Sequence, residues 1–391
     1  MKVMVISADH AVAYAAKLAR TEVVPSFPIT PQTLIVEQLA EFINDGELDA
    51  DFIPADSEHS VMSMAVGASA GGVRVFTATS SQGLALMHEM LYAVPQSRLP
   101  IVMANVNRSL GAASGIWVEY NDSMAERDSG WLQVYVEDNQ EALDATLMAF
   151  RLAEDRRVLL PVMVCLDGFI LSHTVERVDL PEQEEVDRFL PKFVPYNMLD
   201  PSDPKLMNPI VPPEYAMEMR YQLDRAVEHS REVIAEVDEL FAREFGRSYG
   251  GLIDTYRLED AEYAMLTLGT ATGLARQVVD ELRSEGKKAG LIKLRFMRPF
   301  PFKELCAACR DLKALGVFDR SASFNGGGPV YTEVAAALCN VPTTVTGHVA
   351  GIGGRDITPE HMRDMYDIVE KASRGEKVRS VTWHGLRGDM E

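Results

Sequence analysis

Four short stretches near the start of the chain carry side chains that could do acid–base or anion-binding chemistry. They are Phe27–Thr30, Ser57–Glu58, Thr79–Gly83 and Asn107–Arg108. Each follows a run that is predicted to be a strand, or begins the helix after one. The carboxyl ends of parallel strands meet at one edge of a sheet, where ligands bind. We therefore expect the four stretches to converge on one site.

Residues 24–37 predict a strand, a turn with two prolines and a helix. Pro28 and Pro31 each fix a φ angle and push the preceding residue toward extended geometry. Pro31 suits the first position of a helix, which makes Thr30 the expected N-cap. A helix that begins directly after a strand offers unpaired N–H groups to an anionic ligand. The alternative is an ordinary connection in which Thr30 only caps the helix.

Glu58 stands at the start of an apolar helical pattern. An acid in the first turn can simply complement the helix dipole. The more specific hypothesis is a carboxyl group that its neighbours shield from water. Such a group favours its protonated form and can exchange a proton with a heterocycle nitrogen.

Two further stretches could contact a ligand. Thr79–Gly83 is rich in hydroxyls and includes a glycine that allows close backbone approach, but it lacks the Gly-Lys-Ser/Thr ending of a phosphate loop. Arg108 follows an apolar strand and could bind a carboxylate through two N–H groups, although a surface ion pair is equally common. The loop at 115–131 carries two of the three tryptophans, and long loops at a ligand edge are often functional.

Alternating strand and helix patterns must position these side chains. Over residues 1–175 they predict a parallel sheet with helices on both faces. The expected strands are Val23–Val24, Asp51–Ile53, Val73–Thr77, Ile101–Ala104 and Val158–Cys165, and the expected helices are Pro31–Asn44, Ser57–Gly72, Ser81–Val94 and Asn139–Asp155. Residues 176–214 are rich in proline and acids and predict a surface connector. Tyr215–Phe245 predicts one long helix.

A second α/β alternation spans about 260–372. Its expected strands are Tyr263–Leu268, Ala289–Lys293, Val317–Asp319 and Thr343–Thr346, and its expected helices include Ala271–Ser284 and Phe302–Leu315. The sequence therefore predicts two domains. The first covers 1–245, with the connector and long helix at about 176–245, and the second covers 255–391.

Composition excludes several classes of partner. The 58 acidic and 38 basic residues give a formal charge of −20, which disfavours nucleic acid and anionic membranes as partners. No apolar run reaches the roughly 18 to 20 residues of a membrane span, and no secretory signal is visible, so we expect a cytoplasmic protein.

The four cysteines are scattered and do not form a cluster-binding run. Cys306 and Cys309 have redox or metal spacing, but they lie in a helical pattern with no second pair nearby. We expect them in the core, and no metal site on this chain.

The motifs together resemble the α subunit of the 2-oxoacid:ferredoxin oxidoreductases, the pyruvate:ferredoxin oxidoreductase family. The likeness covers nearly the whole chain, in order: Phe-Pro-Ile-Thr-Pro at 27–31, Ser-Glu-His at 57–59, Gly-Ala-Ser-Ala at 67–70, Phe-Thr-Ala-Thr-Ser-Ser-Gln-Gly at 76–83, Asn-Arg at 107–108, Ser-Met-Ala-Glu-Arg-Asp-Ser-Gly-Trp at 123–131, Lys293–Pro301 and Gly347–Arg355. The resemblance implies an α/β thiamine-diphosphate-binding fold. Its first domain would be of the pyrimidine-binding type, and its second would resemble the transketolase C-terminal domain.

The resemblance also implies roles for single residues. Glu58 would contact the aminopyrimidine ring and promote the tautomer that deprotonates the thiazolium carbon, whose ylid attacks the keto carbon of the substrate. Thr30 and Arg108 match catalytic positions that hold the substrate carboxylate, and Asn121 matches a substrate-binding position. The residues implied to line the cofactor cleft are Phe27, Pro28, Ile29, Thr30, Ser80, Ser81 and Gln82.

A missing motif implies that the cofactor site is divided between two subunits. The chain lacks the Gly-Asp-Gly and paired-Asn signature that holds Mg²⁺ and diphosphate in this family. The resemblance therefore implies a β subunit with Mg²⁺ and the diphosphate half of the site. It further implies γ and δ subunits, [4Fe-4S] clusters on partner subunits, ferredoxin or another electron acceptor, and coenzyme A, as in anaerobic metabolism.

Three departures from the family pattern concern the acyl group of the substrate. Phe27 stands where the pyruvate enzymes usually have Tyr, Gln32 stands where they have a small residue, and Glu119–Asp122 replaces Asp-His-Ser-Asp. Pyruvate is the leading substrate. A sister complex for oxalate, phenylglyoxylate or branched 2-oxoacids, and a non-catalytic scaffold subunit, remain alternatives.

Overall fold

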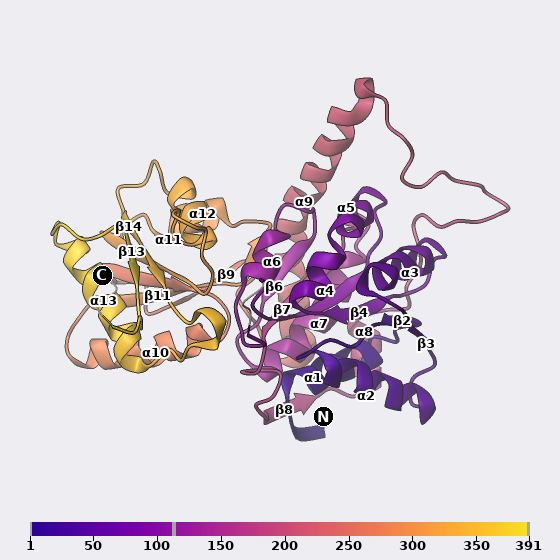
Figure 1. Cartoon of the computed structure of the whole chain (residues 1–391), viewed down its shortest axis with the longest axis horizontal. Helices are drawn as coiled ribbons and strands as arrows, with labels where there is room; N and C mark the ends of the chain where they lie inside the picture. The colour runs from indigo at the N-terminus through magenta and orange to yellow at the C-terminus, as the bar shows by residue number, and fades with distance from the viewer. Residues whose placement is uncertain (1, 112–114, 389–391) are drawn as a thin grey trace.

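Two α/β parts lie side by side in the computed structural model, which describes residues 2–111 and 115–388 (Figure 1). The elements of the N-terminal part, residues 2–245, are β1 (Lys2–Ile6), α1 (Ala8–Leu18), β2 (Val23–Ser26), α2 (Thr33–Asn44), β3 (Asp51–Pro54), α3 (Glu58–Ala70), β4 (Phe76–Thr79), α4 (Ser81–Leu86), α5 (His88–Gln96), β5 (Val102–Asn107), α6 (Asn121–Ala125), β6 (Leu132–Tyr135), α7 (Asn139–Ala153), β7 (Val162–Asp167), β8 (Glu176–Leu180), α8 (Gln183–Phe189) and α9 (Pro213–Phe245).

A five-stranded sheet forms the centre of this part. Its order is β12-β6-β7-β5-β4, where β12 (Phe296–Arg298) comes from later in the chain. Strands β4 to β7 are parallel and fully buried, as expected for a sheet covered on both faces. Side chains of β5 alternate between two cores: Val102 and Ala104 face one, and Met103 faces the other. The parallel pair β2–β3 continues the sheet through a bridge between Val23 and Val75. The predicted covered parallel sheet is confirmed.

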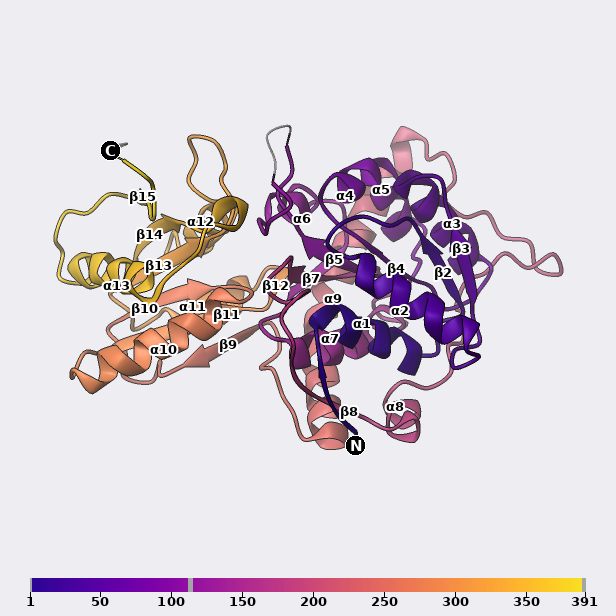
Figure 2. The ribbon, with the colours of Figure 1, turned by 60° about the horizontal axis from the view of Figure 1, so that its bottom comes forward.

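The C-terminal part, residues 253–388, contains β9 (Ile253–Tyr256), β10 (Tyr263–Thr267), α10 (Ala271–Ser284), β11 (Ala289–Leu294), β12 (Phe296–Arg298), α11 (Phe302–Ala308), β13 (Ala314–Asp319), α12 (Pro329–Ala337), β14 (Thr344–Val349), a 3-10 turn (Ile352–Gly354), α13 (Pro359–Ser373) and β15 (Val381–Trp383). Its six-stranded sheet has the order β15-β14-β13-β10-β11-β9 and is parallel except for β9. The two parts also lie side by side in the turned view of Figure 2.

The second part sends one strand into the sheet of the first. After β11, β12 pairs antiparallel with β6 at the edge of the five-stranded sheet. Lys293 and Arg295 flank this crossing and both bind Glu141 of α7, at 2.6 and 3.0 Å. Burial alone would raise the pKa of Glu141, but the two cations bring the pKa below its usual value. A buried ion cluster therefore joins the two parts.

Several predicted boundaries are wrong. The expected helix 81–94 is split at Met87, which ends α4 and starts α5. The expected helix 302–315 ends at Ala308, because Leu315 is needed as a buried residue of β13. The expected surface connector contains β8, which pairs with β1, and α8. The long helix is confirmed as α9, which ends at Phe245 and has Gly246, with a φ of +72°, as its C-cap.

No helix in the described residues has the length and apolar character needed to cross a membrane.

Candidate active site

The predicted N-cap in the loop between β2 and α2 is wrong. Helix α2 begins at Thr33, and its N-cap is Gln32, so Thr30 is not the N-cap and Pro31 is not the first helical residue. The reason is a separate turn before the helix, in which the Gln32 side-chain amide donates to the Phe27 carbonyl oxygen at 3.0 Å. Thr30 is consequently exposed at the sheet edge. Its hydroxyl forms no hydrogen bond within the part of the chain that the structure describes.

The structure brings Arg108 against this loop. Arg108 follows β5, and its guanidinium Nη1 donates to the Thr30 carbonyl oxygen at 3.0 Å. The end of β7 lies against the same loop. A Cβ at Gly168, directly after β7, would lie 2.5 Å from the backbone carbonyl oxygen of Asn107 and 2.9 Å from Pro31 Cγ. Only a glycine fits there, so three strand ends meet at one place.

Glu58 is the first residue of α3 and is only 7% exposed. Its carboxylate packs against the turn after β4, since a Cβ at Gly83 would lie 2.7 Å from Glu58 Oε1 and 2.6 Å from Thr79 Oγ1. Among the described residues no hydrogen bond or ion pair involves this carboxylate. The buried hydroxyls of Thr79 and Ser80 likewise lack partners among those residues. Buried polar atoms are rarely left unpaired, so this group suits a polar ligand.

The turn after β4 is strained. Ser81 has a φ of +48°, an uncommon conformation for a residue other than glycine. Its hydroxyl donates to the Ser109 carbonyl oxygen at 2.6 Å. Ser80 is the N-cap of α4 without a side-chain cap bond, and Gln82 is exposed. The hydrogen bond to Ser109 holds the hydroxyl-rich turn in this conformation, beside Glu58.

Asp122 ties these loops together, a role that the sequence alone did not reveal. Its carboxylate is buried between β5 and α6. It accepts hydrogen bonds from five donors, which are Ser81 N, Asn105 Nδ2, Asn107 Nδ2, Arg108 N and Ser123 N, at 2.8 to 3.2 Å. Burial raises the pKa of Asp122, and the hydrogen bond from Asn107 opposes that shift. Its position in an acid-rich loop was the only available signal.

The remaining predicted residues lie around this network. Phe27 and Ile29 are half-buried and Pro28 is exposed, all in the loop before α2. The amide of Asn121 exchanges hydrogen bonds with the Leu110 backbone, at 2.9 and 3.0 Å, and so closes the loop after Arg108. Its predicted role in substrate binding stays a prediction.

The C-terminal part holds the same loop from the other side. The Tyr120 hydroxyl donates to Asp167 at 2.8 Å, and the Tyr120 N–H donates to the Arg320 carbonyl oxygen at 3.0 Å. Arg320 in turn forms an ion pair with Asp167 at 2.9 Å. The loop that carries Asp122 is therefore fixed by both parts of the chain.

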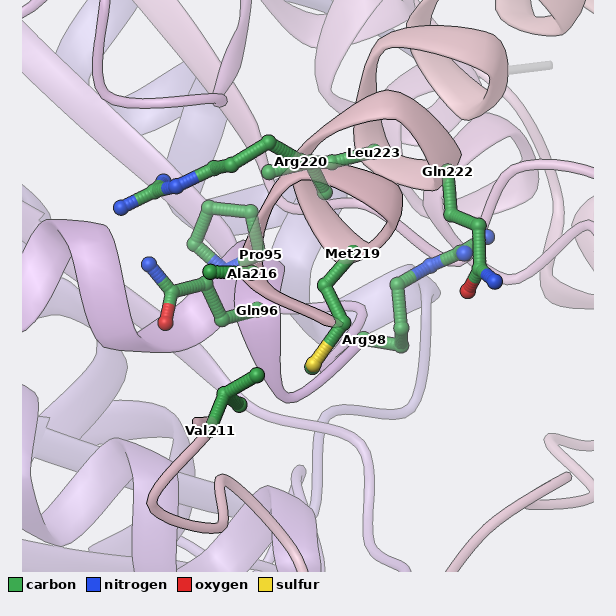
Figure 3. A pocket seen from close by; sticks show the side chains of 9 residues that line it. All are labelled: Pro95, Gln96, Arg98, Val211, Ala216, Met219, Arg220, Gln222 and Leu223. Atoms are coloured by element: carbon green, nitrogen blue, oxygen red, sulfur yellow. The ribbon is translucent and has the colours of Figure 1, made fainter. Parts of the chain in front are cut away.

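A separate pocket of about 180 Å³ lies between the end of α5 and the first turns of α9 (Figure 3). Pro95, Met219 and Leu223 line it, with Arg98 and Arg220 at its rim. None of the predicted site residues contributes to it.

The cysteines do not form a metal centre within the described ranges, where no group of three or more His, Cys, Asp or Glu is placed to hold an ion. Cys309 is buried, and burial raises the pKa of its thiol to about 12. Cys306 is half-buried and packs beside it in the same core.

Family profiles match both parts of the chain. Residues 14–239 match "Pyruvate flavodoxin/ferredoxin oxidoreductase, thiamine diP-bdg", and residues 261–362 match "Pyruvate:ferredoxin oxidoreductase core domain II".

Among solved structures, the chain resembles a 2-oxoglutarate:ferredoxin oxidoreductase from Magnetococcus marinus, with a TM-score of 0.71 and 20% identity, over 95% of this chain and 65% of that one. A split-gene transketolase matches with a TM-score of 0.54 and 14% identity, over 95% of this chain and 99% of that one. At these identities the likeness shows the fold.

Curated relatives match at full length. Pyruvate synthase subunit PorA of Methanothermobacter thermautotrophicus is 53% identical over 391 residues and 100% of both chains. The same-named subunit of Methanocaldococcus jannaschii is 47% identical over 99% of this chain and 98% of the relative. Ketoisovalerate oxidoreductase subunit VorA of Pyrococcus horikoshii is 43% identical over 98% of each. The chain therefore belongs to the pyruvate:ferredoxin oxidoreductase family, as an α-type subunit with a thiamine-diphosphate-binding domain.

Proposed function

We propose that this chain supplies the proton-transfer and carboxylate-binding half of the active site in an enzyme that oxidatively decarboxylates a 2-oxoacid to an acyl-CoA. The observation that carries the proposal is the Glu58 carboxylate, which is 7% exposed and has no hydrogen bond or ion pair among the described residues, beside the buried hydroxyls of Thr79 and Ser80. Thr30 and Arg108 stand at the same sheet edge, where the Thr30 hydroxyl has no partner among the described residues and the Arg108 guanidinium lies against the Thr30 carbonyl.

The residues present fit the pyrimidine half of thiamine diphosphate. Its ring needs a carboxylate at one nitrogen and polar groups at its edge, and the orphaned oxygens around Glu58 are of that kind. When bound, the cofactor supplies a nucleophilic carbon and an electron sink for decarboxylation.

Each residue has a role in this proposal. Glu58 holds and exchanges a proton at the ring nitrogen, since its carboxylate is only 7% exposed and stands beside the hydroxyls of the turn after β4. Arg108 binds the substrate carboxylate through charge-assisted hydrogen bonds, and the Thr30 hydroxyl orients it. Asp122 positions both the Arg108 backbone and the Ser81 turn.

Pyruvate is the substrate that the relatives favour, because two of those named PorA are 53% and 47% identical to this chain. A branched 2-oxoacid is the second candidate, because a relative named for ketoisovalerate is 43% identical over almost the whole chain. Phe27 and Gln32 differ from the usual pyruvate pattern and are the residues to examine first.

The rest of the enzyme would come from other chains. We include in the proposal a β subunit with the diphosphate and Mg²⁺ site, γ- and δ-type subunits, [4Fe-4S] clusters, ferredoxin, coenzyme A and a cytoplasmic location. The scaffold alternative is disfavoured because Glu58, Arg108 and Thr30 are retained together at one edge.

Glu58→Gln in the purified complex tests the proposal. We expect turnover of pyruvate with a dye acceptor to fall by at least about 10²-fold, because general acid–base groups contribute on that order. Glu37→Gln, on the exposed side of α2, is the matched control. Full activity of the Glu58 variant would favour the scaffold. A panel of 2-oxoacids tested on the native complex identifies the substrate.

A further inference from the structure

Glu119 is a buried acid in the loop after Arg108 that has no role in the function proposed above. Its side chain is 7% exposed. One carboxylate oxygen accepts a hydrogen bond from the Ser109 hydroxyl at 2.7 Å. Burial raises the pKa of Glu119, and the hydrogen bond from Ser109 opposes that rise. The carboxylate of Glu119 therefore binds the residue that directly follows Arg108.

Ser109 uses all of its polar groups to hold this loop. Its N–H donates to the Trp117 carbonyl oxygen at 2.9 Å, and its hydroxyl donates to Glu119. Its own carbonyl oxygen accepts the Ser81 hydroxyl at 2.6 Å. Ser109 thus joins the turn after β4 to the loop that carries Glu119.

Arg108 takes its position from the backbone on either side of it. Its N–H donates to the buried Asp122 carboxylate at 3.1 Å, and its carbonyl side leads into Ser109, which Glu119 holds. The Arg108 guanidinium donates to the Thr30 carbonyl oxygen, while its buried Nε has no partner among the described residues. Two acids of one loop therefore anchor the backbone on both sides of this arginine.

The C-terminal part binds the backbone on both sides of Glu119. The N–H of Gly354, in the 3-10 turn after β14, donates to the Val118 carbonyl oxygen at 3.0 Å. The Tyr120 N–H donates to the carbonyl oxygen of Arg320, which follows β13, at 3.0 Å. Glu119 therefore lies between two fixed points of the C-terminal part.

We propose that Glu119 is a positioning residue for substrate binding. Through Ser109 it holds the Arg108 backbone at the sheet edge, and its own backbone ties this loop to the C-terminal part. The inference rests on the proposed function, in which Arg108 binds the carboxylate of the 2-oxoacid. It gives the C-terminal part a role in substrate binding without direct contact with the substrate.

Glu119→Ala in the purified complex tests this inference. We expect the KM for pyruvate to rise about tenfold and kcat to change less than about threefold, because a displaced guanidinium loses binding that the ground state and the transition state share. Hydrogen–deuterium exchange without substrate should become faster in residues 108–111, because the Ser109 hydroxyl loses its acceptor.

Ser109→Ala removes the same hydrogen bond by a smaller change and should raise the KM in the same direction. The double variant should have the same KM as Glu119→Ala alone, because both substitutions remove one interaction.

Glu137→Ala is the matched control. Glu137 is also a largely buried acid that joins the two parts, through Arg276 and Lys293. Both cations keep another acid when Glu137 is removed, since Arg276 also pairs with Asp254 and Lys293 with Glu141. We expect this variant to lower the thermal unfolding temperature and to leave the KM unchanged.

The inference is overturned if Glu119→Ala, in an assembled complex, keeps the native KM while Arg108→Ala raises it, and the proposed function then stands. It is also overturned if exchange in residues 108–111 stays at the native rate, if the effects of the two single variants multiply in the double variant, or if Glu137→Ala raises the KM equally. An unchanged KM in both Glu119→Ala and Arg108→Ala would overturn the carboxylate-binding role of Arg108 together with this inference.

Discussion

At the scale of single residues, the site depends on polar atoms that the fold buries but does not pair. The hydroxyls of Thr79 and Ser80 are buried at one sheet edge and lack partners among the described residues. The Glu58 carboxylate beside them, 7% exposed, forms no hydrogen bond or ion pair with those residues. Leaving a buried polar group unpaired costs about 1 to 3 kcal/mol. Such a cost is common where a ligand completes the hydrogen bonds.

Gly83→Ala tests how closely the glycine and Glu58 must approach. The new methyl group would lie 2.7 Å from Glu58 Oε1, a flexible side-chain end that must move away. We expect turnover to fall at least about tenfold while the complex still assembles, since a small misplacement of a catalytic group is costly.

Gly67→Ala is the matched control, because it lies in the same helix as Glu58 and nothing stands within 4 Å of its added Cβ. It should retain activity and stabilise the helix by up to about 1 kcal/mol. Equal activity in the two variants would show that the Glu58 position is not critical.

Arg108→Ala should raise the KM for the 2-oxoacid by about 10- to 100-fold, because a charge-assisted contact worth about 1.5 to 3 kcal/mol is removed. Steady-state kinetics of the complex measure this. Arg20→Ala, which breaks an exposed pair with Asp187, is the control. An unchanged KM for Arg108→Ala would mean that another group holds the carboxylate.

At the scale of elements, the sequence predicted the features that depend on neighbouring residues, such as buried strands and the positions where they end. The buried apolar runs at β4, β5 and β7 identified the parallel sheet. The ends of β2, β3 and β5 located Thr30, Glu58 and Arg108 at one edge. The start of α2 could not be predicted, because a side-chain bond from Gln32 to Phe27 makes a turn where Pro31 favours a helix. The role of Asp122 was also hidden, since donors up to 41 residues away define it.

The crossing of β12 was equally invisible to the sequence, because it depends on long-range pairing with β6 and on the ion cluster around Glu141. Lys293→Met tests that cluster. Removing one partner of a buried ion pair costs about 3 to 5 kcal/mol. We expect a marked fall in the thermal unfolding temperature of the complex at pH 7. Lys313→Met, which breaks an exposed pair with Glu262, should cost about 1 kcal/mol or less.

The same cluster sets a pH dependence. The folded-state pKa of Glu141 is lowered, so its contribution is complete above the unfolded-state value of 4.5 and is lost as the pH falls through the folded-state pKa. Lys293→Met should therefore reduce the loss of stability below pH 4.5. An identical pH profile in both proteins would contradict this assignment.

At the scale of the whole molecule, exposed apolar side chains gather where the chain projects. The connector before α9 and the first turns of α9 extend beyond the rest of the N-terminal part (Figure 1). Ile210 is 100% exposed, Leu206 81%, Met217 80% and Tyr215 64%. Large exposed apolar patches are typical of protein–protein interfaces. We infer that a partner subunit covers this segment.

The double substitution Ile210→Asp and Met217→Asp should weaken assembly by at least about tenfold, because charges would enter a desolvated interface. Analytical ultracentrifugation of the mixed subunits measures this. Glu218→Gln, in the same exposed turn, is the control. Normal assembly of the double variant would place the partner elsewhere.

Glu58 is proposed to exchange a proton with the pyrimidine ring of thiamine diphosphate in the assembled enzyme. Hydrogen–deuterium exchange at the thiazolium C2 of the bound cofactor, followed by NMR in the complex, tests it most directly. We expect Glu58→Gln to slow this exchange by at least about 10²-fold with the cofactor still bound. An exchange rate equal to that of the native complex would contradict the claim.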